Sequence, residues 1–262
     1  MLRGIFDVLT KPAMRHEWRW RALCKVKTWL MPNYRLAWPH LLWWEDEEFN
    51  AYLARFNELH GFNSDKRWML YQLALMSNEV PGDTAECGAY QGAGSYLICK
   101  ATQKGSPART HFIFDSFEGL STPAPCDGDY WHEGDLRCSL QNFQHPDGNV
   151  IIHKGWIPDR FPDVKDRLFS FVHIDVDLHK PTADSMEFFY PRMSPGGMIL
   201  LDDYGFTSCP GTKKAVDDFM QDKPEKITML SCGSGLLIRR EPSPTNTNHV
   251  SSGGSTSKNG TA

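Results

Sequence analysis

The sequence lacks three features that would each place it in a large class of proteins. No apolar run approaches the ~18 residues that a membrane span needs. The apolar stretch after Met1 is interrupted by Arg3, Asp7 and Lys11, so we expect no signal peptide. Charge of one sign is not in large excess, because the net charge is −4 over 262 residues. We therefore expect neither a membrane span nor a nucleic-acid partner.

The cysteines do not have the spacing of a metal-binding motif. The seven cysteines are scattered, odd in number, and include no Cys-x-x-Cys pair. This pattern argues against a disulfide framework and a zinc site, and it is typical of a reducing compartment. A cytoplasmic location is therefore predicted. Cys126 and Cys138 flank an acidic loop, and two free thiols are favoured over a disulfide between them.

Three zones are predicted along the chain. Residues 1–78 form a helical N-terminal extension, in which the apolar spacing predicts helices near 48–56 and 68–75, the second with Asp65 as N-cap. Residues 79–240 alternate strands with helices, which predicts one α/β domain with a mostly parallel sheet and helices on both faces. Residues 241–262 contain almost no apolar side chain and are predicted to be a disordered tail.

Seven strands are predicted in the α/β domain. The last two are joined by four residues, which is too short for a parallel crossover, so they should form an antiparallel hairpin. The hairpin distinguishes this sheet from a six-stranded, all-parallel nucleotide-binding fold. The predicted strands are 83–88, 111–115, 149–153, 169–175, 197–202, 226–230 and 235–239.

A glycine-rich loop follows the first strand and leads into a helix near Ser95. No lysine follows its last glycine, which excludes a P-loop, and the spacing is not Gly-x-Gly-x-x-Gly. Gly88 permits a sharp turn, and Gly92 and Gly94 permit close approach of a ligand. Glu86 would repel a pyrophosphate but attract a cationic ligand, which favours S-adenosylmethionine over NAD. A glycine-rich turn with a surface glutamate is the alternative for this segment alone.

An acid also ends the second predicted strand. Asp115 follows the glycine loop by roughly 20–30 residues, where a carboxylate can accept both ribose hydroxyls of a nucleoside. Each loop alone is a weak signal. Their order and spacing together predict a cofactor that contains a nucleoside.

Four aspartates lie at the ends of two apolar, strand-like runs: Asp175 and Asp177 after one, Asp202 and Asp203 after the other. If these strands are parallel neighbours, the carboxylates meet at the edge where open α/β sheets bind ligands. Clustered carboxylates raise each other's pKa unless a cation is present, and a hard divalent ion such as Mg²⁺ resolves the repulsion. The Asp-x-Asp spacing would place both side chains on one strand face. Ordinary polar turns are the alternative, and His173 is predicted to be a satisfied core histidine.

An ordered set of motifs lies at Pro81–Gly92, Phe114–Leu120, Lys154–Asp159, His173–Leu178, Tyr190–Gly197, Leu201–Gly205 and Ala215–Phe219. This set resembles the macrocin O-methyltransferase family of class I, S-adenosylmethionine-dependent enzymes. The resemblance implies a Rossmann-like fold and a Mg²⁺-assisted transfer of a methyl group to a hydroxyl of a small molecule, a sugar or natural-product glycoside.

The resemblance also implies a role for individual residues. Asp175, Asp202 and Asp203 would be the metal ligands, and Asp177 the general base. His179 departs from the tyrosine that family members often have after Asp-x-Asp-Leu, which changes the wall of the acceptor pocket. The S-adenosylmethionine site would be lined by Glu86, Gly88, Ser95, Asp115, Ser116 and Trp156.

Two irregular segments carry further predictions. Residues 121–148 form a long insertion typical of a functional lid, and His132 within it is the alternative general base. Residues 11–44 mix basic residues with tryptophans, which predicts either a lid or the arm of a homodimer. A segment on a membrane surface is less favoured, because the basic residues are not confined to one helical face.

Two other functions compete with methyl transfer. A metal-dependent hydroxylase of the related cephalosporin-hydroxylase type would need two histidines beside a carboxylate. Only His173 and His179 lie near the acidic residues in the sequence, which argues against this function. A non-catalytic binding module would keep the fold and lose turnover.

Overall fold

The computed structural model describes residues 12–36, 41–102 and 109–240, with side chains from residue 18 onward. The chain forms two compact units, residues 1–61 and 62–262. The helix over residues 64–76 therefore belongs to the second unit, whereas the sequence analysis placed it in the N-terminal extension. The predicted disordered tail, 241–262, lies outside the described residues.

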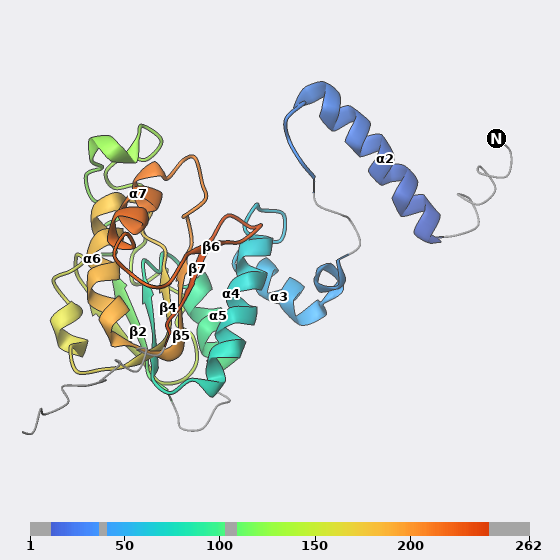
Figure 1. The fold of residues 1–262 in the computed structure, drawn as a ribbon. Coiled ribbons are helices and arrows are strands. Elements are labelled where there is room, and N and C mark those ends of the chain that lie inside the picture. Colours follow the sequence, from blue (N-terminus) through green and yellow to red (C-terminus); the bar gives the residue numbers. More distant parts are fainter. Residues whose placement is uncertain (1–11, 37–40, 103–108, 241–262) are drawn as a thin grey trace, which may run out of the picture. The chain divides into compact units, whose positions relative to one another are not determined.

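The second unit is built on a seven-stranded sheet with the order β3-β2-β1-β4-β5-β7-β6 (Figure 1). The five strands from β3 to β5 are parallel, whereas β7 pairs antiparallel with both β5 and β6. The prediction of a mostly parallel sheet with a terminal hairpin is confirmed. The strands are β1 Asp83–Cys87, β2 His111–Asp115, β3 Val150–Lys154, β4 Phe169–Ile174, β5 Met193–Leu201, β6 Thr228–Met229 and β7 Gly235–Ile238.

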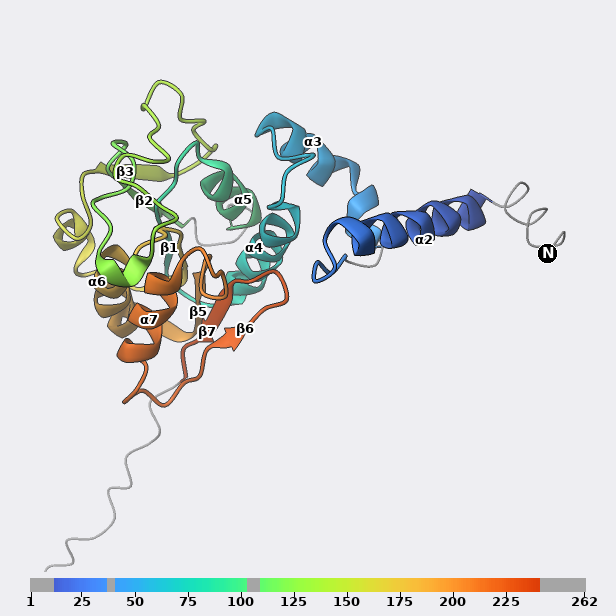
Figure 2. The ribbon, with the colours of Figure 1, turned by 90° about the horizontal axis from the view of Figure 1, so that it is seen from above.

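Helices cover both faces of this sheet. Figures 1 and 2 show α4 and α5 on one face and α6 and α7 on the other. Their bounds are α4 Ser64–Met76, α5 Ala93–Thr102, α6 His179–Phe189 and α7 Pro210–Phe219. Short 3-10 helices lie at η2 Ser77–Glu79, η3 Pro125–Asp127, η4 Phe161–Val164 and η5 Tyr190–Arg192.

The central strands are buried on both sides, as a parallel sheet between two helical layers requires. All six residues of β4 are buried. On the α6–α7 face, Phe114, Phe161 and Phe189 pack with ring centroids between 5.1 and 5.9 Å apart. This core fixes the strand ends, which carry the polar residues of interest.

The topology contains a switch point between β1 and β4. The chain runs from β1 outward to β2 and β3, then returns to place β4 on the opposite side of β1. Connections therefore diverge at the carboxyl ends of β1 and β4, and such a point is where open α/β sheets bind ligands.

The described part of the N-terminal unit contains three helical segments. It contains α2 Pro12–Leu30, η1 Leu42–Glu45 and α3 Glu47–Arg55. The Asp46 side chain caps α3 by accepting a hydrogen bond from the Phe49 N–H at 2.7 Å. Trp18 and Trp29 are exposed on α2. The lid and dimer-arm interpretations of this segment stay predictions.

Two local predictions were wrong. Asp65 lies inside the first turn of α4, and the N-cap position is held by Asn63. β4 ends at Ile174, so Asp175 and Asp177 lie in the loop beyond it, and the two-residue strand period does not orient them. The loop of residues 121–148 is irregular apart from η3, as expected.

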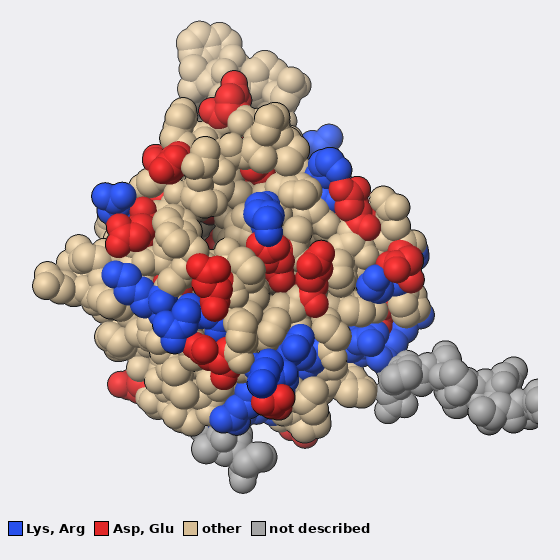
Figure 3. Space-filling view, turned by 90° about the vertical axis from the view of Figure 1, so that its left-hand side faces the viewer, with Lys and Arg blue, Asp and Glu red and all other residues tan. Residues whose placement is uncertain are grey.

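The surface over α6 and α7 carries charges of both signs. Lys180 pairs with Asp184 on α6, and Lys213 pairs with Asp217 on α7. Figure 3 shows Lys and Arg side chains beside Asp and Glu side chains across the middle and lower part of this face. Among the described helices, none is long and apolar enough to cross a membrane.

Candidate active site

The acidic site begins where the parallel ladder of β1, β4 and β5 ends. Ile174 of β4 is in register with both Cys87 of β1 and Leu201 of β5. The next residue in each case continues the ladder, because the Asp175 N–H donates to the Cys87 carbonyl at 2.8 Å and the Asp202 N–H donates to the Ile174 carbonyl at 2.9 Å. Pairing of neighbouring strands therefore brings Asp175 and Asp202 together.

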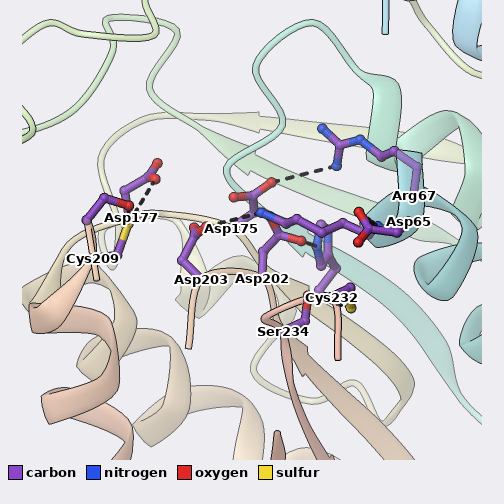
Figure 4. A network of polar contacts seen from close by, with 12 residues as sticks. Asp65, Arg67, Asp175, Asp177, Asp202, Asp203, Cys209, Cys232 and Ser234 are labelled. Carbon is purple, nitrogen blue, oxygen red and sulfur yellow. Dashed lines mark hydrogen bonds and ion pairs between the residues drawn. The ribbon is translucent and has the colours of Figure 1, made fainter. Parts of the chain in front are cut away.

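The aspartates form two adjoining groups (Figure 4). Ligand atoms of His173, Asp175 and Asp202 all lie within 4.8 Å of one another. Ligand atoms of Asp177, Asp203 and Cys209 likewise lie within 4.8 Å of one another and form a second group. The four aspartates therefore lie close together at one edge of the sheet, as predicted. The two-residue period of a strand does not align Asp175 with Asp177, because β4 ends at Ile174.

Asp177 is positioned by a sharp turn rather than by a strand. Its φ is 59°, in the left-handed region that non-glycine residues rarely adopt. Thr212 of α7 holds this turn by donating to the Asp177 carbonyl at 2.9 Å. The Cys209 thiol lies 3.7 Å from the Asp177 carboxylate, and Trp131 of the long insertion donates to the Cys209 sulfur at 3.2 Å.

Two cations from α4 reach the acidic site. Lys66 forms an ion pair with Asp202 and lies 3.2 Å from Asp203. Arg67 lies 3.9 Å from Asp175, which it approaches in Figure 4. Both side chains are largely buried, so the carboxylates receive positive charge from within the fold.

A buried chain of hydrogen bonds connects the acidic site to the glycine loop. His173 bonds to Asp202 through Nε2 at 3.3 Å and to Glu86 through Nδ1 at 2.8 Å. Glu86 also accepts a hydrogen bond from Ser95 of α5, whose hydroxyl lies 3.2 Å from His111 Nε2. The prediction of a satisfied core histidine at 173 is confirmed.

Burial and neighbouring charges set the protonation states along this chain. Burial disfavours the charged form of His173, but its hydrogen bonds to Asp202 and Glu86 raise its pKa to about 10. Burial works against ionisation of Glu86 as well, yet the bond to His173 keeps the Glu86 pKa below its ordinary value. His173 is therefore a buried cation between two carboxylates.

The four aspartates differ in how their charge is compensated. Burial opposes ionisation of Asp202, but Lys66 and His173 outweigh it and lower the Asp202 pKa. Burial and the charges of Asp202 and Asp203 raise the pKa of Asp175. Burial and the same two charges raise the pKa of Asp177. Burial and Asp202 likewise raise the pKa of Asp203, despite its contact with Lys66.

The donor set fits a hard divalent cation. Asp175 and Asp202 offer oxygens within 4.8 Å of each other, and Asp203 offers one in the second group. Carboxylate oxygens are the preferred ligands of Mg²⁺. Burial, together with the charges of neighbouring carboxylates, raises the pKa of Asp175, Asp177 and Asp203. A divalent ion would balance these charges.

Asp115 organises the glycine loop. One oxygen of its carboxylate accepts the Ala89 N–H at 2.7 Å and the Tyr90 N–H at 3.1 Å, and the other accepts the Phe117 N–H at 2.6 Å. Ser116 accepts the Glu118 N–H at 3.0 Å and donates to the Gly119 carbonyl at 3.2 Å. Both residues therefore shape the loops at the ends of β1 and β2.

The glycines of this loop are required by protein neighbours. A Cβ on Gly88, whose φ is +79°, would lie 1.9 Å from the Asp175 carbonyl oxygen. A Cβ on Gly94 would lie 2.0 Å from a carboxylate oxygen of Glu86. The expectation that Gly94 leaves room for a ligand is therefore wrong, because the buried Glu86 side chain occupies that space.

The remaining predicted residues lie at different depths. Trp156 is half-exposed after β3, next to Gly155, whose N–H donates to the Asp115 carbonyl at 3.0 Å. His132 is a surface side chain that pairs with Asp135 at 3.6 Å. Within the part of the chain that the structure describes, no contact brings the His132 ring to the four aspartates. Glu86 and Ser95 are buried and bonded to each other.

The macrocin-O-methyltransferase profile matches residues 71–230. The chain belongs to the macrocin-O-methyltransferase family. The match contains the glycine loop, Asp115 and the four aspartates, and it begins after Lys66 and Arg67.

Two curated relatives are named O-methyltransferases. The 8-demethyl-8-(2,3-dimethoxy-alpha-L-rhamnosyl)-tetracenomycin-C 4'-O-methyltransferase of Streptomyces olivaceus is 31% identical over 161 residues, covering 55% of this chain and 60% of the relative. The demethyldecarbamoylnovobiocin O-methyltransferase of Streptomyces niveus is 28% identical over 165 residues, again covering 55% and 60%. The matched part of this chain thus spans 60% of the length of these relatives.

Solved structures show the same fold. The O-methyltransferase NovP superposes with a TM-score of 0.55 at 24% identity, covering 67% of this chain and 80% of NovP. The calicheamicin methyltransferase CalS11 superposes with a TM-score of 0.58 at 18% identity, covering 82% and 90%. The predicted class I methyltransferase fold is confirmed.

Sequence reasoning missed the residues that compensate the acids. Lys66 shares the buried face of α4 with Leu70 and Leu73, and a lysine at that helical spacing was a readable signal. Cys209 gave no signal, because it reaches Asp177 only through the fold. Asp127 was also missed: its buried carboxylate accepts the His179 N–H at 2.7 Å and fixes the start of α6.

Proposed function

We propose that the chain is an S-adenosylmethionine-dependent O-methyltransferase that modifies a hydroxyl of a small molecule, a sugar or a natural-product glycoside. The observation that carries this proposal is the meeting of four aspartates with a glycine loop at the carboxyl edge of a macrocin-O-methyltransferase-family sheet. The names of the two curated relatives support the acceptor class, because both are O-methyltransferases and the substrate named for the first bears a rhamnosyl group.

The proposed cofactor site is built on the loops after β1 and β2. Asp115 and Ser116 hold these loops by their backbone hydrogen bonds, and Gly88 provides the turn against Asp175. Trp156, beside the end of β2, is assigned to the adenine side. We assign Glu86 and Ser95 to the support of the loop and of α5 rather than to ligand contact, because both are buried and bonded to each other.

The proposed metal site consists of Asp175, Asp202 and Asp203. When bound there, Mg²⁺ supplies Lewis-acid stabilisation of an acceptor oxygen and helps to orient it. His173 keeps Asp202 in place through its Nε2 contact at 3.3 Å. Arg67 does the same for Asp175 at longer range.

Asp177 is the proposed general base. S-adenosylmethionine would supply the methyl group to the acceptor oxygen and leave as S-adenosylhomocysteine, and the Asp177 carboxylate would accept the hydroxyl proton. Burial and the neighbouring charges raise the pKa of Asp177, which makes its ionised form a stronger base than an exposed aspartate. His132 is less suited, because its ring is exposed and paired with Asp135.

The hydroxylase alternative is less well supported. A 2-His-1-carboxylate site needs two histidines, and each cluster found among the described residues offers at most one. Both ring nitrogens of His173 are bonded to carboxylates. A non-catalytic module stays a formal alternative that turnover would exclude. The cytoplasmic location and the homodimer stay predictions.

Methyl transfer to a panel of sugars and glycosides tests the function. The purified protein should transfer a labelled methyl group from S-adenosylmethionine to oxygen, located by NMR of the product. Asp202→Asn and Asp203→Asn should each lower turnover, whereas Asp184→Asn, which removes a surface ion pair with Lys180, should not. Full turnover in both site variants would refute the assigned chemistry.

A further inference from the structure

Lys66 occupies an unusual position for a lysine. Its side chain is 9% exposed, on the face of α4 that packs into the fold. Its ammonium forms an ion pair with Asp202, lies 3.2 Å from Asp203, and lies 4.6 Å from the centroid of the Phe206 ring. The group is thus surrounded by two carboxylates and one aromatic face.

This arrangement stabilises the acidic site without any added ion. An isolated buried ammonium or carboxylate is strongly disfavoured, so each remains charged only because the other is present. Lys66 contacts the same two carboxylates, Asp202 and Asp203, that are proposed to hold the divalent cation. The same carboxylate oxygens cannot pair with the ammonium and coordinate a divalent cation at the same time.

We propose that Lys66 is an internal competitor for the divalent cation, so that metal binding requires its ammonium to leave Asp202 and Asp203. The inference rests on the proposed metal site. It concerns a residue outside the segment 71–230 that matches the family. The four-carbon stem of lysine permits the ammonium to swing away while α4 stays in place.

The competition lowers cation affinity and stabilises the metal-free protein. In the absence of metal, Lys66 balances two carboxylates that would otherwise repel each other. In the presence of metal, part of the binding free energy is used to displace the ammonium. Lys66 is therefore a positioning residue, because it acts on the carboxylates and not on the acceptor.

Manganese binding to the full chain tests the proposal. Mn²⁺ affinity is measured by electron paramagnetic resonance for wild type, for Lys66→Met, and for Lys213→Met as the matched control. Lys213 also lies over an aromatic ring, 4.7 Å from the Tyr204 centroid, and pairs with Asp217, but it is on the surface of α7. Lys66→Met should bind Mn²⁺ at least about tenfold more tightly than wild type, which corresponds to about 1.4 kcal/mol, and Lys213→Met should not differ.

Thermal unfolding provides the second readout. Without metal, Lys66→Met should melt at a lower temperature than wild type, and added Mn²⁺ should raise its Tm by more than it raises that of wild type. If Lys66→Met binds Mn²⁺ with unchanged or weaker affinity than wild type, the proposed competition is wrong.

Amine labelling of the wild-type protein keeps the proposal testable if Lys66→Met does not fold. Acetylation by an N-hydroxysuccinimide ester, read by mass spectrometry, should increase at Lys66 when Mn²⁺ is added and stay constant at Lys213. Equal labelling of Lys66 with and without Mn²⁺ would overturn the proposal.

The outcomes separate this inference from the proposed function. If wild type binds Mn²⁺ and Lys66→Met binds it no better, only the role of Lys66 fails. If no variant binds Mn²⁺, the metal site and the competition fail together, while binding of S-adenosylhomocysteine still tests the methyl-donor site independently.

Discussion

Single residues in the site have their charge set by their neighbours more than by their own chemistry. Asp177 and Asp202 are both aspartates in loops at the carboxyl edge of the sheet, yet burial and nearby carboxylates raise the pKa of the first. Lys66 and His173 overcome burial and lower the pKa of the second. The fold thus creates one carboxylate suited to accept a proton and another that remains ionised.

Replacement of Asp177 tests this assignment. Asp177→Asn keeps the shape of the side chain but removes the proton acceptor, so kcat should fall by roughly 10²–10⁴-fold. Affinity for S-adenosylhomocysteine should change little, because Asp177 is not assigned to cofactor contact. Steady-state kinetics and calorimetry measure the two quantities. An unchanged kcat would assign the proton transfer to another group.

His111 supplies a pH-dependent test of the buried chain. Burial lowers the pKa of His111 to about 4, against the attraction of Glu86, and His173 adds to the lowering. The unfolded chain binds a proton at His111 near pH 6.5 and the folded chain does not, so stability is lost as the pH falls from 6.5 to 4. The loss is at most ~3 kcal/mol, since one pKa unit is worth 1.36 kcal/mol.

The measurement compares wild type with His111→Gln by urea unfolding across this pH range. The buried aspartates also have raised pKa values, so the difference between the two proteins is the informative quantity. Wild type should lose stability relative to His111→Gln as the pH falls from 6.5 to 4. A constant difference would mean that His111 is not held neutral by the fold.

At the scale of elements, the site depends on the contact between the glycine loop and the loop after β4. Gly88 turns with a φ of +79° directly against the Asp175 carbonyl, so the cofactor loop and the acidic loop constrain each other. The hydrogen-bonded chain through Ser95, Glu86 and His173 connects α5, β1 and β4 beneath the same contact. Displacement of either loop should therefore disturb both sites.

An alanine pair separates crowding from backbone strain. Gly88→Ala places a Cβ 1.9 Å from the Asp175 oxygen, whereas at Gly128, with a similar φ of +77°, the nearest atom is 3.5 Å away. Gly128→Ala should cost about 1–3 kcal/mol, because a φ of 77° with a ψ of −155° is a backbone conformation that only glycine readily adopts. Gly88→Ala should cost clearly more and weaken S-adenosylhomocysteine binding. Equal unfolding free energies, measured in urea, would contradict the crowded contact.

The elements themselves were largely predictable, and the reasons are physical. The seven strands and their hairpin follow from short apolar runs, and the meeting of the acids follows from parallel pairing of β4 with β5. The position of Asp177 did not follow from the sequence, because a left-handed turn held by Thr212 of α7 replaces the expected strand period. A local sequence pattern cannot predict a contact that forms only in the tertiary fold.

At the scale of the whole molecule, sequence pattern located the acids but not their counter-charges. Lys66 and Arg67 come from α4, more than 100 residues before the aspartates they approach. All of the proposed site, from Lys66 to Cys209, lies in the second compact unit, and residues 1–61 form a unit of their own. The proposed chemistry is therefore a property of residues 62–240.

The central claim is that the loops after β1 and β2 bind a methyl-donor nucleoside beside a divalent-cation site. Calorimetric titration of the full chain with S-adenosylhomocysteine, with and without Mg²⁺, tests it most directly. We predict saturable binding with a Kd in the micromolar range in both conditions, because the Asp115 carboxylate holds the glycine loop through hydrogen bonds within the protein. Absence of binding in both conditions would contradict this claim, because the acidic site would then have no methyl donor beside it.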